Sequence, residues 1–496
     1  MTTNLARVPV LGARPPLRQS ASLPTIAVAV LGAAAAAYVT VDHTALWRGL
    51  LATAIGVNLI VLGMRWPRAA ALATLLFLPF LALVRRLLIA DTGWIGNDPL
   101  VLVGPVVTLF LIYRLYGLED RRFDKDVVSK LALALLALTI LEAFNPLGTG
   151  GFVASLGGLI FVAIPLLWFF VGRAVGNERT VRILLYAVVG VALAVSIYGI
   201  FQTEFTSGQR LPSWDQAWYE VAGYTALDVG QAGARQIRPF STFSSNGEYS
   251  AYLTVALMII FALVFHRRFL LALFVPLFAF ALFSSGGRSG MALSALAAVV
   301  LIGARTRKLA VGLGVVVVGI GLVYGAALAF GPRLDTAAGL SSNAVSERNV
   351  SGLLHPLDPG QSSVLARWGN FTNGVEDGFK NPAGAGTAST NIAGRNLSSD
   401  TQAGRATDND VADVFRSLGA VGGLLYLTLI FFAFRAVFTR YSREPRWTLF
   451  AAAGVMIVML GTWLNGGQYA LAPLTWFLLG WATRPSVDPP EAEAPA

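Results

Sequence analysis

The chain contains no cysteine, only three histidines and few charged residues. Of its 496 residues, 13% are Asp, Glu, Lys or Arg, well below the roughly 25% of soluble domains. Without cysteine there are no disulfides, no thiolate catalysis and no cysteine-bound zinc. The histidines (His43, His266 and His355) are too few and too scattered to favour a metal site. We therefore expect no metal and no cofactor.

Hydrophobic residues make up 55% of the chain, and they fall in runs of the length that crosses a bilayer. This pattern predicts an all-α integral membrane protein with about 14 transmembrane helices. The predicted spans are 23–42, 46–64, 69–89, 99–117, 127–144, 152–172, 181–202, 248–265, 269–285, 289–304, 309–331, 411–437, 447–464 and 469–483.

Most of the 37 Lys and Arg residues lie in loops on one side of this scheme, and the positive-inside rule makes that side cytoplasmic. The net charge of +10 therefore reflects topology, and we expect no nucleic acid partner. No cleavable signal peptide is expected. The predicted organisation is a cytoplasmic tail (1–22), N-terminal helices (23–202), an external loop (203–247), central helices (248–331), a large external loop (332–410), C-terminal helices (411–483) and a cytoplasmic tail (484–496).

Three arginines on the predicted outer face are candidates for binding an anionic substrate. Arg238 precedes a span, Arg288 lies in the glycine-rich segment SSGGRSG, and Arg367 lies in the most helix-like part of the large loop. A guanidinium group is permanently charged and suited to two-point contacts with phosphate. The alternative is that each side chain reaches lipid head groups, as we expect for Arg85 and Arg86.

The segment TDNDVADVFRSLG contains the candidate general base. Asp408 or Asp410, placed near the membrane surface, is suited to accept a proton from a sugar hydroxyl, and Asn409 is a candidate substrate contact. The alternative is that these residues cap the following helix, while Asp413 and Arg416 form an ion pair.

A polar segment also leads into the span that begins near residue 248. Asn246, Glu248 and Tyr249 are candidates to line an external cavity. Alternatively, Ser245 and Asn246 simply cap the helix.

Four stretches resemble conserved segments of the O-antigen ligase and polymerase superfamily, whose members are multispanning enzymes that act on undecaprenyl-diphosphate-linked glycans. RPFSTFSSNGEYSAYL is similar to the family's G-T-F-x-N-P-N-x-x-A-x-Y-L. FSSGGRSGMALSALAAVV resembles T-x-S-R-x-x-x-L-x-L. ARWGNFTNGVEDGFKNPAGAGTAS resembles an Arg, an apolar helix and N-P-x-G-x-G. DNDVADVFRSLGAVGGLLYL resembles H/D-N-x-Y-L-x-x-L-x-E-x-G-x-x-G-x-x-L.

The resemblance implies a GT-C-like, metal-independent, inverting glycosyltransferase in the bacterial cytoplasmic membrane, with its active site facing outward and both termini cytoplasmic. It implies functional roles for Arg238, Arg288 and Arg367. Asp408 stands where ligases of the family have histidine, which favours a polysaccharide polymerase. Gly247 and Val411 depart from the family's proline and aromatic residue.

The expected partners are an undecaprenyl-diphosphate-linked glycan donor and acceptor, membrane lipid, a chain-length regulator and a flippase. A ligase of the same superfamily is the first alternative. A lipid-linked oligosaccharide flippase or transporter is the second. Transporters tend to have internal repeats and charges at mid-membrane depth. No internal repeat is obvious in this sequence, and its predicted spans carry few charges.

Overall fold

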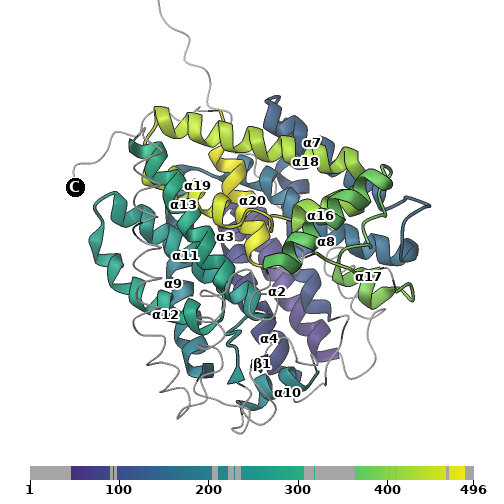
Figure 1. Cartoon of the computed structure of the whole chain (residues 1–496), viewed down its shortest axis with the longest axis horizontal. Coiled ribbons are helices and arrows are strands. Elements are labelled where there is room, and N and C mark those ends of the chain that lie inside the picture. The colour runs from purple at the N-terminus through teal and green to yellow at the C-terminus, as the bar shows by residue number, and fades with distance from the viewer. Residues whose placement is uncertain are drawn as a thin grey trace, which may run out of the picture.

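The computed structural model describes residues 46–89, 93, 96, 98–203, 211–221, 228–229, 236–306, 318, 364–401, 403–407, 409–464 and 469–485. The predicted span 23–42, nearly all of the predicted span 309–331, and Asp408 lie outside these residues. Within them the chain is helical, apart from one antiparallel pair of two-residue strands. The helices cross one another in one bundle (Figure 1).

The elements of the N-terminal half follow the predicted spans, except α10, which lies in the predicted external loop 203–247. They are α2 (Leu46–Arg65), α3 (Pro67–Phe77), η2 (Leu78–Phe80), α4 (Leu81–Leu87), η3 (Pro99–Leu102), α6 (Val103–Ile112), η4 (Tyr113–Leu118), α7 (Val127–Glu142), α8 (Gly151–Val175), α9 (Glu178–Thr203) and α10 (Ser213–Val221). The remaining elements are β1 (Asp228–Val229), β2 (Gln236–Ile237), α11 (Asn246–Phe265), η5 (Phe269–Phe274), α12 (Val275–Ser284), α13 (Arg288–Thr306), α16 (Val364–Lys380), α17 (Ile392–Leu397), α18 (Asp410–Arg443), α19 (Trp447–Val458) and α20 (Leu471–Ala482).

The described part of the chain has eight helices that are long and apolar enough to cross a membrane, whereas 12 of the 14 predicted spans fall within it. The predicted span 127–144 corresponds to α7, which has 16 residues and is not one of the eight. Three further predicted spans correspond to shorter apolar segments, namely 269–284, α19 and α20. A helix of 12 residues, such as α19, is about 18 Å long, well short of the roughly 30 Å hydrocarbon core. Hydropathy over-counts spans because a short apolar helix also suits the interior of a bundle.

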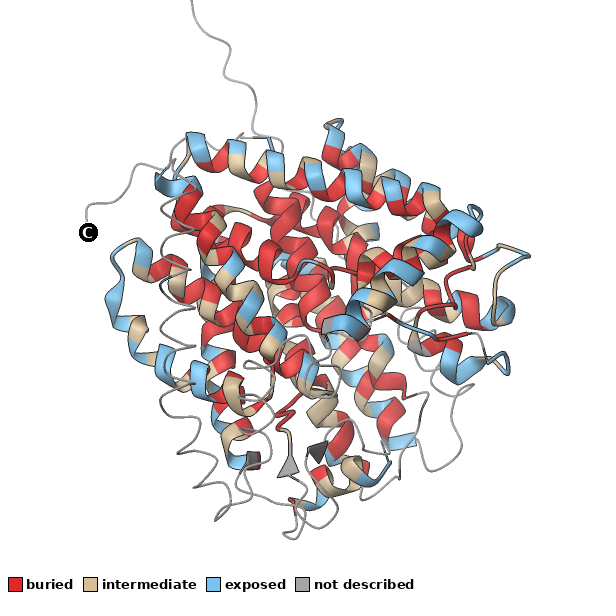
Figure 2. Cartoon of the chain, in the orientation of Figure 1, coloured by how far each residue is buried: buried red, intermediate tan, exposed pale blue. Residues whose placement is uncertain are grey.

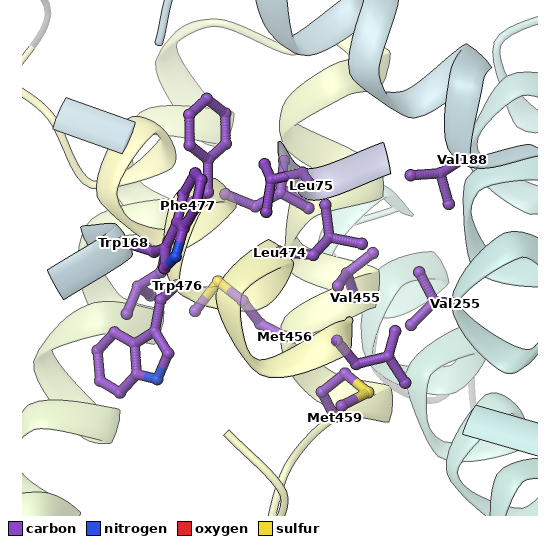
Figure 3. Close-up of a cluster of buried hydrophobic side chains, with 14 of the residues drawn as sticks. Leu75, Trp168, Val188, Val255, Val455, Met456, Met459, Leu474, Trp476 and Phe477 are labelled. Carbon is purple, nitrogen blue, oxygen red and sulfur yellow. The ribbon is translucent and has the colours of Figure 1, made fainter. Parts of the chain in front are cut away.

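Helices α19 and α20 form the centre of the bundle. Every residue of both helices is buried, and Figure 2 shows them inside the surrounding helices. A helix that is apolar on all sides is expected in such a position. Their side chains pack with those of α8, α9 and α11 in one core, where Trp168, Trp476 and Phe477 lie close together (Figure 3).

Glycines bring α8 and α20 into close contact. A Cβ atom on Gly172 would collide with the carbonyl oxygen of Phe477, and one on Gly480 would collide with the carbonyl oxygen of Phe169. Small residues let membrane helices approach at backbone distance. The two glycines therefore set the spacing of this helix pair.

Loop contacts join segments that the topology predicts on the same side. On the predicted cytoplasmic side, Arg173 forms ion pairs with Asp124 at 2.8 Å and Asp126 at 2.6 Å, and it donates to the Thr483 carbonyl. On the predicted outer side, the Thr149 N–H donates to the Ala385 carbonyl at 2.8 Å. Most of the described candidate site residues lie in or next to segments that are predicted to be external.

Candidate functional site

The polar lead-in at 238–245 ends in a helix cap. The Ser245 hydroxyl accepts a hydrogen bond from the Glu248 N–H at 3.2 Å, and α11 begins at Asn246. The capping role predicted for Ser245 is therefore confirmed. The Glu248 side chain is buried, and its Oε1 accepts the N–H of Ala470 at 3.2 Å. This carboxylate connects the start of α11 to the start of α20.

The second stretch, which contains Arg288, lies against the same end of α11. The Asn246 side-chain amide donates to the Ser285 carbonyl at 3.3 Å. A Cβ atom on Gly287 would lie 2.5 Å from the Cβ of Ser250, so the two backbones are in close contact. Arg288 is half-buried and is the first residue of α13. The structure thus brings Asn246 and Arg288 to the adjacent ends of two helices.

The fourth stretch contains two residues with positions set by hydrogen bonds. Asn409 caps α18 by accepting the Val411 N–H at 2.9 Å, so the capping alternative is confirmed for this residue. Asp410 is buried, its N–H donates to the Gly461 carbonyl at 2.7 Å, and its carboxylate accepts the Leu464 N–H.

The predicted ion pair between Asp413 and Arg416 is not formed. Arg416 instead binds Asp377 of α16 at 2.8 Å, while Asp413 accepts hydrogen bonds from the N–H and hydroxyl of Thr407, both at 2.8 Å. A tertiary partner 39 positions away in the sequence has replaced the local one.

Helix α18 is sharply kinked at Gly419, where φ is 70° and ψ is −175°. The kink folds the first turns of α18 back, so that the Phe415 ring packs directly on Gly423. L-residues rarely adopt this backbone conformation, which glycine adopts readily. The apolar part of the predicted span 411–437 therefore begins after the kink, and residues 410–418 form a separate short helical segment beside α16.

The third stretch caps that short segment with its N-P-x-G-x-G loop. The Ala385 N–H donates to the Arg416 carbonyl at 2.9 Å, and the Gly386 N–H donates to the Ser417 carbonyl at 3.0 Å. These donors satisfy carbonyl groups that the kink leaves without helical partners. The third and fourth stretches therefore form one unit.

A second N-P-x-G-x-G segment packs against this loop. It is NPLGTG at 145–150, before α8, and the Asn145 side chain donates to the carbonyls of Ala383 at 3.0 Å and Gly384 at 3.2 Å. No internal repeat was predicted from the sequence, and the pairing of these two segments is not among the predictions. The recurrence of the six-residue pattern was the signal that could have revealed it.

The four stretches thus belong to one network of contacts, and the connection between α19 and α20 links its halves. Glu248 binds one end of that connection at Ala470, and Asp410 binds the other at Leu464. The sequence analysis did not assign any role to this connection. Its sequence, Asn-Gly-Gly between apolar segments, is typical of any loop.

Three further candidate residues, Arg367, Arg238 and Tyr249, form none of the hydrogen bonds described above. Arg367 is exposed near the start of α16, on the same side of the helix as Gly374 and Gly378, which pack on α18 further along. Arg238 is half-buried two residues before Phe240. Tyr249 is fully buried, with its hydroxyl directly against Gly199, so it packs inside the bundle.

An apolar cavity lies next to this network, inside the bundle. It is lined by Leu78, Leu81, Val101, Gly104, Pro105, Ile160, Phe161, Ile164, Pro165, Trp168, Tyr469 and Pro473. Tyr469, which lines the cavity, directly precedes Ala470, the residue that Glu248 binds. Within the described ranges, no three His, Cys, Asp or Glu side chains gather closely enough to hold a metal ion.

The described residues define a helical protein with eight helices that have the length and composition of membrane spans. No family model, no curated protein and no solved structure matches the chain.

Proposed function

We propose that this protein is a membrane glycosyltransferase that polymerises undecaprenyl-diphosphate-linked oligosaccharide units on the outer face of the cytoplasmic membrane. The observation that carries the proposal is the contact network of the four stretches, in which Glu248 of the first stretch and Asp410 of the fourth bind the two ends of the α19–α20 connection, 222 and 54 positions away. Segments so distant in sequence are expected to converge where they build a common site.

In the proposed reaction, Arg238 and Arg288 bind the diphosphate of the donor lipid. They stabilise the negative charge that grows on the diphosphate as the bond from the anomeric carbon to its phosphate oxygen breaks. The hydroxyl oxygen of the acceptor sugar forms the new bond to that carbon from the opposite side, which inverts its configuration. The hydroxyl proton passes to an aspartate, and undecaprenyl diphosphate leaves.

We assign the role of base to Asp408 rather than Asp410. The Asp410 carboxylate is buried and accepts the Leu464 N–H, so it holds the backbone. Asp408 precedes the cap residue of α18. A carboxylate at that place is suited to accept a proton from a bound sugar.

The test is an elongation assay with purified protein and an undecaprenyl-diphosphate-linked repeat oligosaccharide. The proposal predicts a ladder of products that persists in EDTA and is lost in Arg288→Ala. Transfer of one chain onto an unrelated acceptor would favour the ligase alternative. Transport of the lipid-linked oligosaccharide in proteoliposomes without elongation would favour the transporter. A full ladder from Arg288→Ala, or a ladder abolished by EDTA, would contradict the mechanism.

A further inference from the structure

Arg86, at the end of α4, is buried and binds two outer segments at once. It forms an ion pair with Asp215 of α10 at 2.9 Å, and it donates to the Ser241 carbonyl. Its guanidinium also lies 4.7 Å from the centre of the Phe240 ring. The expectation that Arg86 anchors the chain to lipid head groups is therefore wrong, because Asp215 and the lead-in segment surround it.

Ser241 is held in an unfavourable backbone conformation by bonds to all of its polar groups. Its φ is 51°, a region that non-glycine residues adopt uncommonly. Its N–H donates to the Gln202 side chain at 2.7 Å, its hydroxyl donates to the Val195 carbonyl at 2.6 Å, and its carbonyl accepts from Arg86. Strain of this kind persists where the surroundings over-determine it, often at functional sites.

Gln202 and Asp215 complete the network. The Gln202 side-chain oxygen also accepts the Phe240 N–H at 3.1 Å, and its amide donates to Asp215 at 2.8 Å. Asp215 is fully buried and accepts a further hydrogen bond from the Tyr198 hydroxyl at 2.6 Å. α9 and the end of α4 therefore bind the backbone at 240–241, within three residues of Arg238, and α10 holds Gln202 and Arg86 through Asp215.

We propose that Arg86, together with Gln202 and Asp215, is a positioning residue that fixes Arg238 for binding the diphosphate of the substrate. The inference rests on the proposed function only for the role of Arg238. Fixing the backbone that follows a half-buried arginine reduces the conformational entropy lost when the anion binds. Arg86 itself is occupied by its contacts with Asp215 and Ser241, so it acts through the backbone.

The experiment measures hydrogen exchange of the Phe240 and Ser241 amides in full-length protein, together with KM and kcat for an undecaprenyl-diphosphate-linked oligosaccharide. Arg86→Lys keeps the charge but not the fork that reaches two partners. We expect amide exchange about ten-fold faster and KM about ten-fold higher, with kcat nearly unchanged. Gln202→Met, which removes the acceptor of both amides at similar size, should act in the same direction and serves if Arg86→Lys does not fold.

Arg173→Lys is the matched control. Arg173 is also buried, ion-paired and 4.8 Å from a phenylalanine ring centre, but it lies among the predicted cytoplasmic segments. The Arg173→Lys variant should leave both the hydrogen exchange of the Phe240 and Ser241 amides and the KM unchanged. Unchanged exchange in both Arg86→Lys and Gln202→Met would overturn the proposal. Faster exchange with normal KM, while Arg238→Ala raises KM, would also overturn it. If Arg238→Ala has no effect on KM, the role assigned to Arg238 under the proposed function fails instead. The hydrogen-exchange measurement does not depend on that role, so the two failures can be told apart.

Discussion

The Glu248 carboxylate accepts a hydrogen bond from the backbone N–H of Ala470, 222 positions later in the chain, at 3.2 Å. Both partners are buried. A buried N–H that loses its acceptor costs about 1–3 kcal/mol. This hydrogen bond therefore connects the N-terminal end of α11 to the central helix α20.

Glu248→Ala should destabilise the protein, whereas Glu248→Gln should not, because glutamine retains an oxygen that can accept the Ala470 N–H. The expected loss for the alanine variant is about 1–3 kcal/mol. Thermal unfolding in detergent measures the difference. Equal unfolding temperatures for the alanine variant and the unchanged protein would show that this hydrogen bond does not hold α20.

Asp408→Asn and Asp410→Asn should have different effects on elongation. Asparagine at 410 keeps an oxygen for the Leu464 N–H, so most of the activity should remain. Asparagine at 408 removes the proposed base, and general base catalysis is worth about 100-fold or more in rate. Initial rates at saturating donor check both. Loss of activity in the 410 variant alone would move the base to Asp410.

Gly480→Ala should destabilise the helix pair α8 and α20. The added methyl group would collide with the Phe169 carbonyl, and overpacking of this kind costs about 1–3 kcal/mol or more. Gly190→Ala in α9 is the control, because a Cβ atom there meets nothing within 4 Å. Unfolding by heat should separate the two variants; similar curves would contradict the close packing.

Gly419→Ala should weaken the kink of α18. Its φ of 70° and ψ of −175° disfavour any residue with a Cβ atom, and that atom would also collide with the Pro382 carbonyl. We expect faster hydrogen exchange at Ala385 and Gly386, whose N–H groups cap the segment before the kink. Unchanged exchange there would show that the cap does not depend on Gly419.

Hydropathy and local capping rules predicted much of the helical part of the fold. The long spans in the N-terminal half lie where they were predicted, and Ser245 caps the start of α11, as its hydroxyl side chain suggested. Both depend on residues within one or two helical turns. Hydropathy did not distinguish a short helix in the core from a span, as α19 and α20 show, because both are apolar on all sides.

Hydropathy and capping rules could not predict the side-chain contacts of the candidate site. Asp413 and Arg416 have a spacing that favours an ion pair, yet Arg416 binds Asp377 because α16 packs on the same segment. Arg86 likewise binds Asp215, which no local pattern connects to it. Partners of this kind are set by the packing of helices. The four stretches that resemble a family predict which segments matter and their order along the chain, but not which side chains contact each other.

The most direct test of the account is a structure of the protein with undecaprenyl diphosphate bound. We predict that the diphosphate contacts Arg238 and Arg288, beside the adjacent ends of α11 and α13. A diphosphate bound among the opposite loops near Arg173, or one that touches neither Arg238 nor Arg288, would contradict the account.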